Sequence, residues 1–286
     1  MKVFDTPCTR RILVGAAMAL AFGMFAARAH AQVDPWEFEV YPYATEGPGV
    51  LELETDNAYV ANGHSDPDEG TAGPKYKSQG TWYNQYELTY GLTDRIEAAA
   101  YLNLAKPSGA SYQYAGSKYR LRGRLFDEET LPVNLGWYAE LEWHKTPQWD
   151  DDELELELRP IIEKDIGRFS LIVDPKFEKP LMGPDKNKGW EFGYANGIYY
   201  RWMREVSPGV EFYGGIGRID DTDPLRDQQH YIFPVLWGSL PNGIAYSVGP
   251  GFGLTNGSDR VLLKFNVEFE RYIGALFKSS DGGWFF

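Results

Sequence analysis

The chain has 286 residues, of which 41 are acidic and 28 basic, and it contains one cysteine. This acidic balance argues against nucleic acid as a partner and against docking on anionic lipid headgroups through a basic patch. Aromatic residues make up 15% of the chain and glycine occurs 31 times, whereas sequence signals for helices are nearly absent.

Residues 1–31 have the pattern of a secretory signal peptide. A basic start is followed by the apolar stretch Ile12–Ala27 and by the small-x-small site Ala29-His30-Ala31. The pair Arg10-Arg11 is also compatible with a twin-arginine signal. Removing this leader takes away Cys8, four basic residues and one acid, which leaves a net charge of −16 and neither a disulfide nor a thiolate metal site.

Residues 32–48 form a separate N-terminal segment. Apolar and polar side chains alternate in it from Trp36 to Tyr43. This alternation predicts either an extra strand or a segment that folds into the lumen of a larger structure.

Residues 49–272 consist of about twelve segments in which side chains alternate between apolar and polar. Each is close to the ~9–11 residues of a membrane-crossing strand, and no stretch after the leader reaches the ~20 apolar residues of a membrane helix. The pattern predicts an all-β fold, namely an antiparallel transmembrane β-barrel of about 12 strands. The predicted strands are Val50–Ala61, Thr81–Gly91, Arg95–Ala105, Tyr114–Phe126, Val133–His144, Asp152–Lys164, Arg168–Lys179, Trp190–Met203, Gly209–Ile219, Gln228–Trp237, Ile244–Leu254 and Arg260–Tyr272.

The connections between these strands also alternate. Tight turns such as Leu92-Thr93-Asp94, Asp165-Ile166-Gly167, Val206-Ser207-Pro208 and Leu240-Pro241-Asn242 take every second position, and longer polar loops such as Asn62–Gly80 fill the others. Short turns at one end and longer loops at the other are typical of outer-membrane barrels, in which the short turns face the periplasm.

The two faces of each strand differ in charge, and alternation alone does not say which face is inside. Charged side chains facing water predict a soluble periplasmic β-protein, whereas leucines facing lipid and charges facing a wet lumen predict a membrane barrel. Long strands, aromatic residues near strand ends, and charges that are segregated by sign from strand to strand favour the barrel.

The stretch Tyr86–Leu102, "YELTYGLTDRIEAAAYL", resembles the strand–turn–strand hairpin of the Gram-negative outer-membrane β-barrels of the phenol meta-pathway-type transporter family. The recurring turn of that family is matched by Tyr90, Gly91, Leu92, Thr93, Asp94 and Arg95. The resemblance implies an outer-membrane channel or transporter-like barrel for phenolic or other small hydrophobic solutes. It carries no catalytic residues.

Residues 273–286 form a C-terminal tail that ends in Trp284-Phe285-Phe286. A terminal aromatic residue resembles the signal that the barrel-assembly machinery recognises. The polar run Ser279–Gly283 separates Phe286 from the last predicted strand, so Phe269–Tyr272 is an alternative position for that signal.

Charged side chains of three neighbouring predicted strands form a ladder on the lumen face, in which the bases of Tyr114–Phe126, together with Arg159, are the expected partners of the acids on the next two strands. They have two interpretations: a transverse field that selects solutes by charge and dipole, or a structural ion network inside a nearly closed barrel. The predicted selectivity residues are Lys118, Arg120, Arg122, Arg124, Glu140, Glu142, Glu153, Glu155, Glu157 and Arg159.

Other chemistry is weakly indicated. His144, Asp151 and His230 are weak candidates for a metal site at the outer mouth, since imidazole and carboxylate suit Zn or Cu. A hydrolase is not supported, since the chain has no Gly-x-Ser-x-Gly motif. In addition, Ser117 and Ser170 have no obvious histidine partner. The Gly-rich stretch Gly249–Leu254 is not followed by a helix that would make it a phosphate loop.

The sequence therefore predicts a non-enzymatic outer-membrane channel for small organic solutes, with no cofactor. Its expected partners are the lipid bilayer, lipopolysaccharide, the barrel-assembly machinery and a small-molecule solute. The alternatives are a structural or binding barrel with an occluded lumen and a soluble periplasmic β-protein.

Overall fold

The computed structural model describes residues 33–67, 69–70 and 73–272. The predicted leader, the tail at 273–286 and its proposed assembly signal Phe286 lie outside the described residues. Within the described ranges, no helix is long and apolar enough to cross a membrane.

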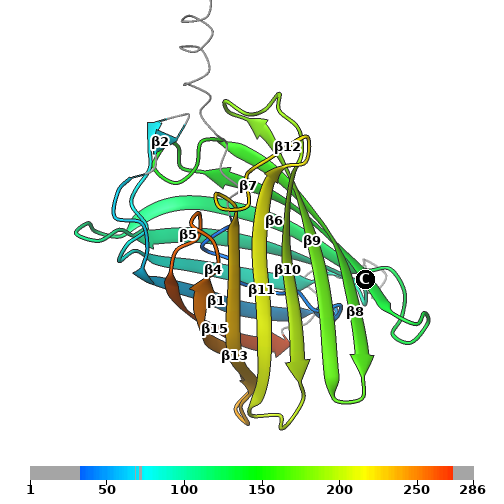
Figure 1. The fold of residues 1–286 in the computed structure, drawn as a ribbon. Helices are drawn as coiled ribbons and strands as arrows, with labels where there is room; N and C mark the ends of the chain where they lie inside the picture. Colours follow the sequence, from blue (N-terminus) through cyan, green and yellow to red (C-terminus); the bar gives the residue numbers. More distant parts are fainter. Residues whose placement is uncertain (1–32, 68, 71–72, 273–286) are drawn as a thin grey trace, which may run out of the picture.

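Twelve long strands form one closed antiparallel barrel (Figure 1). Each strand pairs with its neighbour in the chain, and the first pairs with the last, so that Leu53 lies opposite Phe269. The strands are β1 (Val50–Asn62), β4 (Trp82–Gly91), β5 (Ile96–Lys106), β6 (Gln113–Arg124), β7 (Asn134–His144), β8 (Leu154–Ile166), β9 (Phe169–Met182), β10 (Glu191–Tyr200), β11 (Ser207–Arg218), β13 (Gln229–Ser239), β14 (Ile244–Gly253) and β15 (Val261–Tyr272). The two-residue strands β2 (Glu69–Gly70), β3 (Gly73–Pro74) and β12 (Asp221–Thr222) lie in the loops.

The faces of the strands are oriented as a membrane barrel requires. On β6, Tyr119 and Leu121 are 57% and 46% exposed, whereas Lys118 and Arg120, between and beside them, are 1% and 3% exposed. The same alternation exposes Leu158 on β8 and buries its neighbours in the chain. Because the aliphatic side chains point outward and the charges inward, the outer surface suits hydrocarbon. The barrel prediction is confirmed, and the soluble alternative is wrong.

The tight turns and the loops lie at opposite ends of the barrel (Figure 1). The shortest turn is Gly167-Arg168, between the paired residues Ile166 and Phe169. Gly167 has a φ of 62°, a left-handed conformation that glycine adopts without a steric penalty. We call these two ends the turn end and the loop end.

One predicted turn is misplaced. Ser207 and Pro208 begin β11, and the preceding strand, β10, ends at Tyr200 rather than at Met203. The hydroxyl of Ser207 donates to the Met203 carbonyl and accepts from the Trp202 N–H. This side chain closes the connection by satisfying backbone groups that a tight turn would have paired itself.

Residues 33–48 contain no strand and run along the inside of the barrel. Val33 donates its N–H to Gln229 at the loop end. Further along the segment, Glu46 donates its N–H to Glu97 at the turn end. The segment therefore traverses the whole lumen before the chain enters β1.

Candidate functional site

The lumen is the candidate site, and residues 33–48 occupy part of it; we call these residues the lumen segment. Its upper part is held at the loop end, where the Trp36 indole donates to the Leu104 carbonyl at 2.8 Å and packs edge-on against Tyr83 and Trp149. Lower down, the N–H groups of Tyr41 and Tyr43 donate to Asp174 and Glu163.

Lys118 joins the lumen segment to the barrel wall. Its ammonium lies 2.5 Å from Asp34 and 2.7 Å from Glu37 of the segment. It also lies 3.4 Å from Glu140 and 3.3 Å from Glu142 of the neighbouring strand β7. Since Lys118 is only 1% exposed, four carboxylates supply the partners that a buried ammonium needs.

Arg159 makes a second junction. Its guanidinium donates to Glu37 of the lumen segment and to Glu157 of its own strand. It also lies 4.5 Å from the ring centre of Tyr138 and 5.1 Å from that of Tyr41. Arg159 is therefore held by ion pairs and by aromatic faces at the same time.

Arg120 and Arg122 pair with acids of β4 and β5 rather than with the predicted partners on β7 and β8. Arg120 lies 2.5 Å from Glu87 and 2.9 Å from Glu97, and Arg122 lies 2.7 Å from Glu97. Both acids are on the preceding strands β4 and β5. The basic strand β6 thus bridges acidic neighbours on both of its sides.

Three predicted ladder residues lie at the margins of this network. Glu155 is near the loop end, 3.6 Å from His144. Glu153 precedes β8 and is exposed, and Arg124, at the turn end of β6, donates to the Asp94 carbonyl. The other seven predicted ladder residues lie in the interior of the barrel. Their network also contains acids and bases that were not predicted, namely Asp34, Glu37, Glu87, Glu97, Lys176, Glu211 and Lys264.

The opposite side of the lumen is aromatic. Phe38 of the lumen segment packs against Phe233, Tyr213 and Tyr231, with ring centres 4.8, 5.3 and 5.6 Å away. Lys264 donates to the Phe38 carbonyl at 2.8 Å. This aromatic cluster lies on β11 and β13, away from the ion pairs of β5–β8.

Two cavities flank the aromatic cluster. The loop-end cavity, of about 610 Å³, is lined by Trp36, Phe38, Tyr76, Tyr83, Trp149 and Tyr231 among others. The turn-end cavity, of about 390 Å³, begins one residue further along the lumen segment and is lined by Glu39, Val40, Tyr199, Trp237 and Lys264 among others. Phe38 and the rings around it separate the two.

The weak metal candidates are not brought together. His144 lies beside Glu142 and Glu155, whereas His230, on β13, contacts Tyr194 and Gln228. Asp151 lies 3.8 Å from Lys75. The two histidines do not meet because β7 and β13 stand apart in the barrel. Within the part of the chain that the structure describes, no group of three possible ligands includes a histidine.

The serines considered for a hydrolase have other partners. Ser117 shares a hydrogen bond with Tyr114, and Ser170 donates to Glu163. Neither contact provides the imidazole base that would activate a serine nucleophile.

Neither the family models nor the curated sequences that were compared give a match. Among solved structures, the chain is similar to an outer membrane channel from Pseudomonas putida F1, with a TM-score of 0.54 and 13% identity over 84% of this chain and 100% of that one. The monoaromatic hydrocarbon channels TodX (a deltaS2S3 mutant) and CymD align with TM-scores of 0.41, at 9% and 10% identity, over 80% and 90% of this chain and 91% and 97% of theirs. The first likeness shows the fold of an outer-membrane β-barrel.

Proposed function

We propose that this chain is an outer-membrane channel for small organic solutes, with uncharged aromatic molecules as the favoured class. The observation that carries the proposal is the aromatic-lined cavity at the loop end, which lies above a second cavity on the same side of the lumen. Aromatic side chains bind aromatic solutes by offset or edge-to-face packing. The proposed path leads from the loop-end cavity past Phe38 to the turn-end cavity.

The lumen segment gives the path its shape. The ion pairs of Glu37 with Lys118 and Arg159 hold the segment in the lumen, and Phe38 packs its ring against the β11–β13 wall. A small displacement of Phe38 would join the two cavities without breaking these ion pairs. We therefore propose Phe38 as the gate.

The ladder residues that lie within the barrel strands, and therefore not Glu153, are proposed to set the charge preference. Acids outnumber bases in this lumen, and an excess of negative charge at a narrow passage attracts cations and repels anions. Replacing Glu155 by Gln removes one negative charge near the loop end and is expected to lower the permeability of cations relative to anions. The matched control is Glu153→Gln, because Glu153 is exposed outside the strand. An unchanged permeability ratio in conducting Glu155→Gln barrels would contradict this role.

The experiment that tests the channel itself is single-channel recording of the refolded chain in a planar bilayer. Phenol added on the loop side is expected to interrupt the ion current, whereas glucose is not. Phe38→Ala is expected to raise the current, and Phe252→Ala, a ring on the outer face, should leave it unchanged.

A second candidate function is a closed barrel that binds a solute without passing it. The observation that favours it is the ion network, which buries Lys118, Arg159 and Glu37 in the lumen. Absence of current from both the intact chain and Phe38→Ala, together with binding of phenol, would support this candidate and refute the channel.

A further inference from the structure

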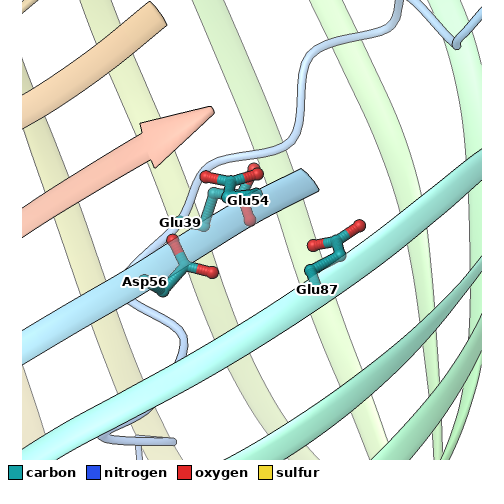
Figure 2. A group of neighbouring side chains, drawn as sticks. All are labelled: Glu39, Glu54, Asp56 and Glu87. Atoms are coloured by element: carbon teal, nitrogen blue, oxygen red, sulfur yellow. The ribbon is translucent and has the colours of Figure 1, made fainter. Parts of the chain in front are cut away.

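Four carboxylates lie together in the lumen, beside the ion network described above. They are Glu39 of the lumen segment, Glu54 and Asp56 of β1, and Glu87 of β4 (Figure 2). One oxygen from each lies within 4.8 Å of the others. Glu54, Asp56 and Glu87 are 7%, 1% and 1% exposed, so water does not screen their mutual repulsion.

The charges in this group are not balanced by the protein. One oxygen of Glu87 accepts from Arg120 at 2.5 Å. Three other oxygens of the group, Oε2 of Glu39, Oδ1 of Asp56 and Oε2 of Glu87, are buried without a hydrogen-bond donor. Buried acceptors normally have partners, so these oxygens require either shared protons or a bound cation.

An amide next to the carboxylates gives independent support. Gln85, which is fully buried on β4, donates from its amide to Asp56 at 3.2 Å, and its Oε1 has no donor. The two ends of an amide side chain are interchangeable by a rotation of 180°. With the amide turned so that Oε1 faces Asp56, Gln85 adds a neutral oxygen ligand beside the four acids.

We propose that Glu39, Glu54, Asp56 and Glu87 bind a calcium ion that fastens the lumen segment to the barrel wall. Oxygen-only ligands suit hard cations rather than Zn or Cu. Ca–O distances of about 2.3–2.6 Å place opposite ligands up to about 5.2 Å apart, so oxygens that lie within 4.8 Å of one another can share one ion. Several carboxylates and a neutral oxygen from one protein suit calcium, which takes about 6–8 oxygen ligands, better than magnesium, which keeps several waters and binds about one or two carboxylates.

The ion can reach this site from the turn end. Glu39 and Glu54 also line the turn-end cavity, so one side of the carboxylate group opens into it. Since Glu39 is the only one of the four ligands that belongs to the lumen segment, calcium would couple the position of that segment to the wall formed by β1 and β4.

Titration calorimetry of the full refolded chain in chelator-treated detergent, with Ca²⁺ and Mg²⁺ alone as probes, tests the site. We expect Ca²⁺ to bind more tightly than Mg²⁺, and Asp56→Asn to weaken Ca²⁺ binding at least tenfold. Glu178→Gln, which removes a lumen acid paired with Lys176, is the matched control and should bind as the intact chain does.

Two further carboxylate groups, Glu46–Glu52–Glu270 and Asp150–Asp152–Glu155, could also bind Ca²⁺. The variants Glu270→Gln and Asp150→Asn distinguish them from the proposed site, because they should leave the Asp56-dependent binding in place. Heat-modifiable mobility in gels verifies that each variant is folded. Luminescence of Tb³⁺, displaced by Ca²⁺, provides a second measurement on the intact chain. Absence of Ca²⁺ binding, or Ca²⁺ binding that Asp56→Asn leaves unchanged in a folded barrel, would overturn the proposal in favour of carboxylates that share protons.

Discussion

Arg159 shows how a charged side chain is kept inside a membrane barrel. It is 2% exposed, and it pairs with one acid of the lumen segment and one of its own strand. Its burial is tolerable only because both partners are present, since removing one member of a buried network leaves an uncompensated charge.

Arg159→Met is therefore expected to lower the free energy of unfolding by about 3–5 kcal/mol. The variant leaves Glu37 and Glu157 with only their lysine partners. Urea unfolding in lipid vesicles measures the change. The control Arg168→Met alters an exposed residue in a turn and should cost less than about 0.5 kcal/mol. Equal stability of the two variants would show that the network does not hold the barrel together.

Asp152, in the loop before β8, makes stability depend on pH. Burial raises the pKa of its carboxyl to about 6. The folded state therefore holds the proton more tightly than the unfolded state, whose pKa is near the ordinary 3.8, and stability falls as the pH rises from about 4 to about 6. Asp152→Asn should be indistinguishable from the intact chain below pH 4 and more stable above pH 6. Unfolding midpoints in chelator at pH 3.5, 5 and 7 check this; a difference that is constant with pH would contradict it.

The contacts of single residues were predictable only where strand parity and strand order fixed them. Lys118 was expected to face Glu140 and Glu142 because all three share the lumen face of paired strands, and it does. Its contacts with Asp34 and Glu37 were not predictable, because nothing in strand alternation places the lumen segment beside β6. The carboxylate group around Asp56 was missed for the same reason: Glu39 joins it from outside the sheet.

The strands, taken as elements, were predictable because each repeats one signal over many residues. Twelve segments with period-two alternation became twelve paired strands, with ends displaced by a few residues. The lumen segment carries the same signal and is nevertheless not a strand. Its N–H groups at Tyr41, Tyr43 and Glu46 donate to wall carboxylates instead of to a neighbouring backbone, and a sequence pattern does not distinguish these two kinds of acceptor.

A charge on the outer face of a strand tests the orientation of the whole element. Leu158→Arg on β8 should make folding into a bilayer less favourable by about 2–4 kcal/mol if the side chain faces hydrocarbon near its midplane. Leu131→Arg, in the exposed turn between β6 and β7, is the matched control, with an expected cost of less than about 1 kcal/mol. Equal costs would place Leu158 outside the hydrocarbon.

For the molecule as a whole, the lumen segment decides how much of the barrel interior is open. Removing residues 33–47 takes away Asp34, Glu37 and Phe38 together, along with their contacts to the wall. The deletion should raise single-channel conductance several-fold, and it should lower stability by at least about 3 kcal/mol because Lys118 and Arg159 lose partners. Adding a synthetic peptide of residues 33–48 to the loop side should reduce the current again. An unchanged conductance would mean that the segment does not obstruct the path.

The seam between β1 and β15 has a topological consequence. Once Leu53 is paired with Phe269, the barrel is closed around the lumen segment, which is continuous with the first strand, β1. The closed wall gives the lumen segment no lateral exit, so it leaves only by sliding along the barrel axis. A compact domain fused ahead of Val33 would therefore block its withdrawal toward the turn end. Biogenesis therefore either places the segment before the last hairpin closes or threads it lengthwise into the finished ring from the turn end.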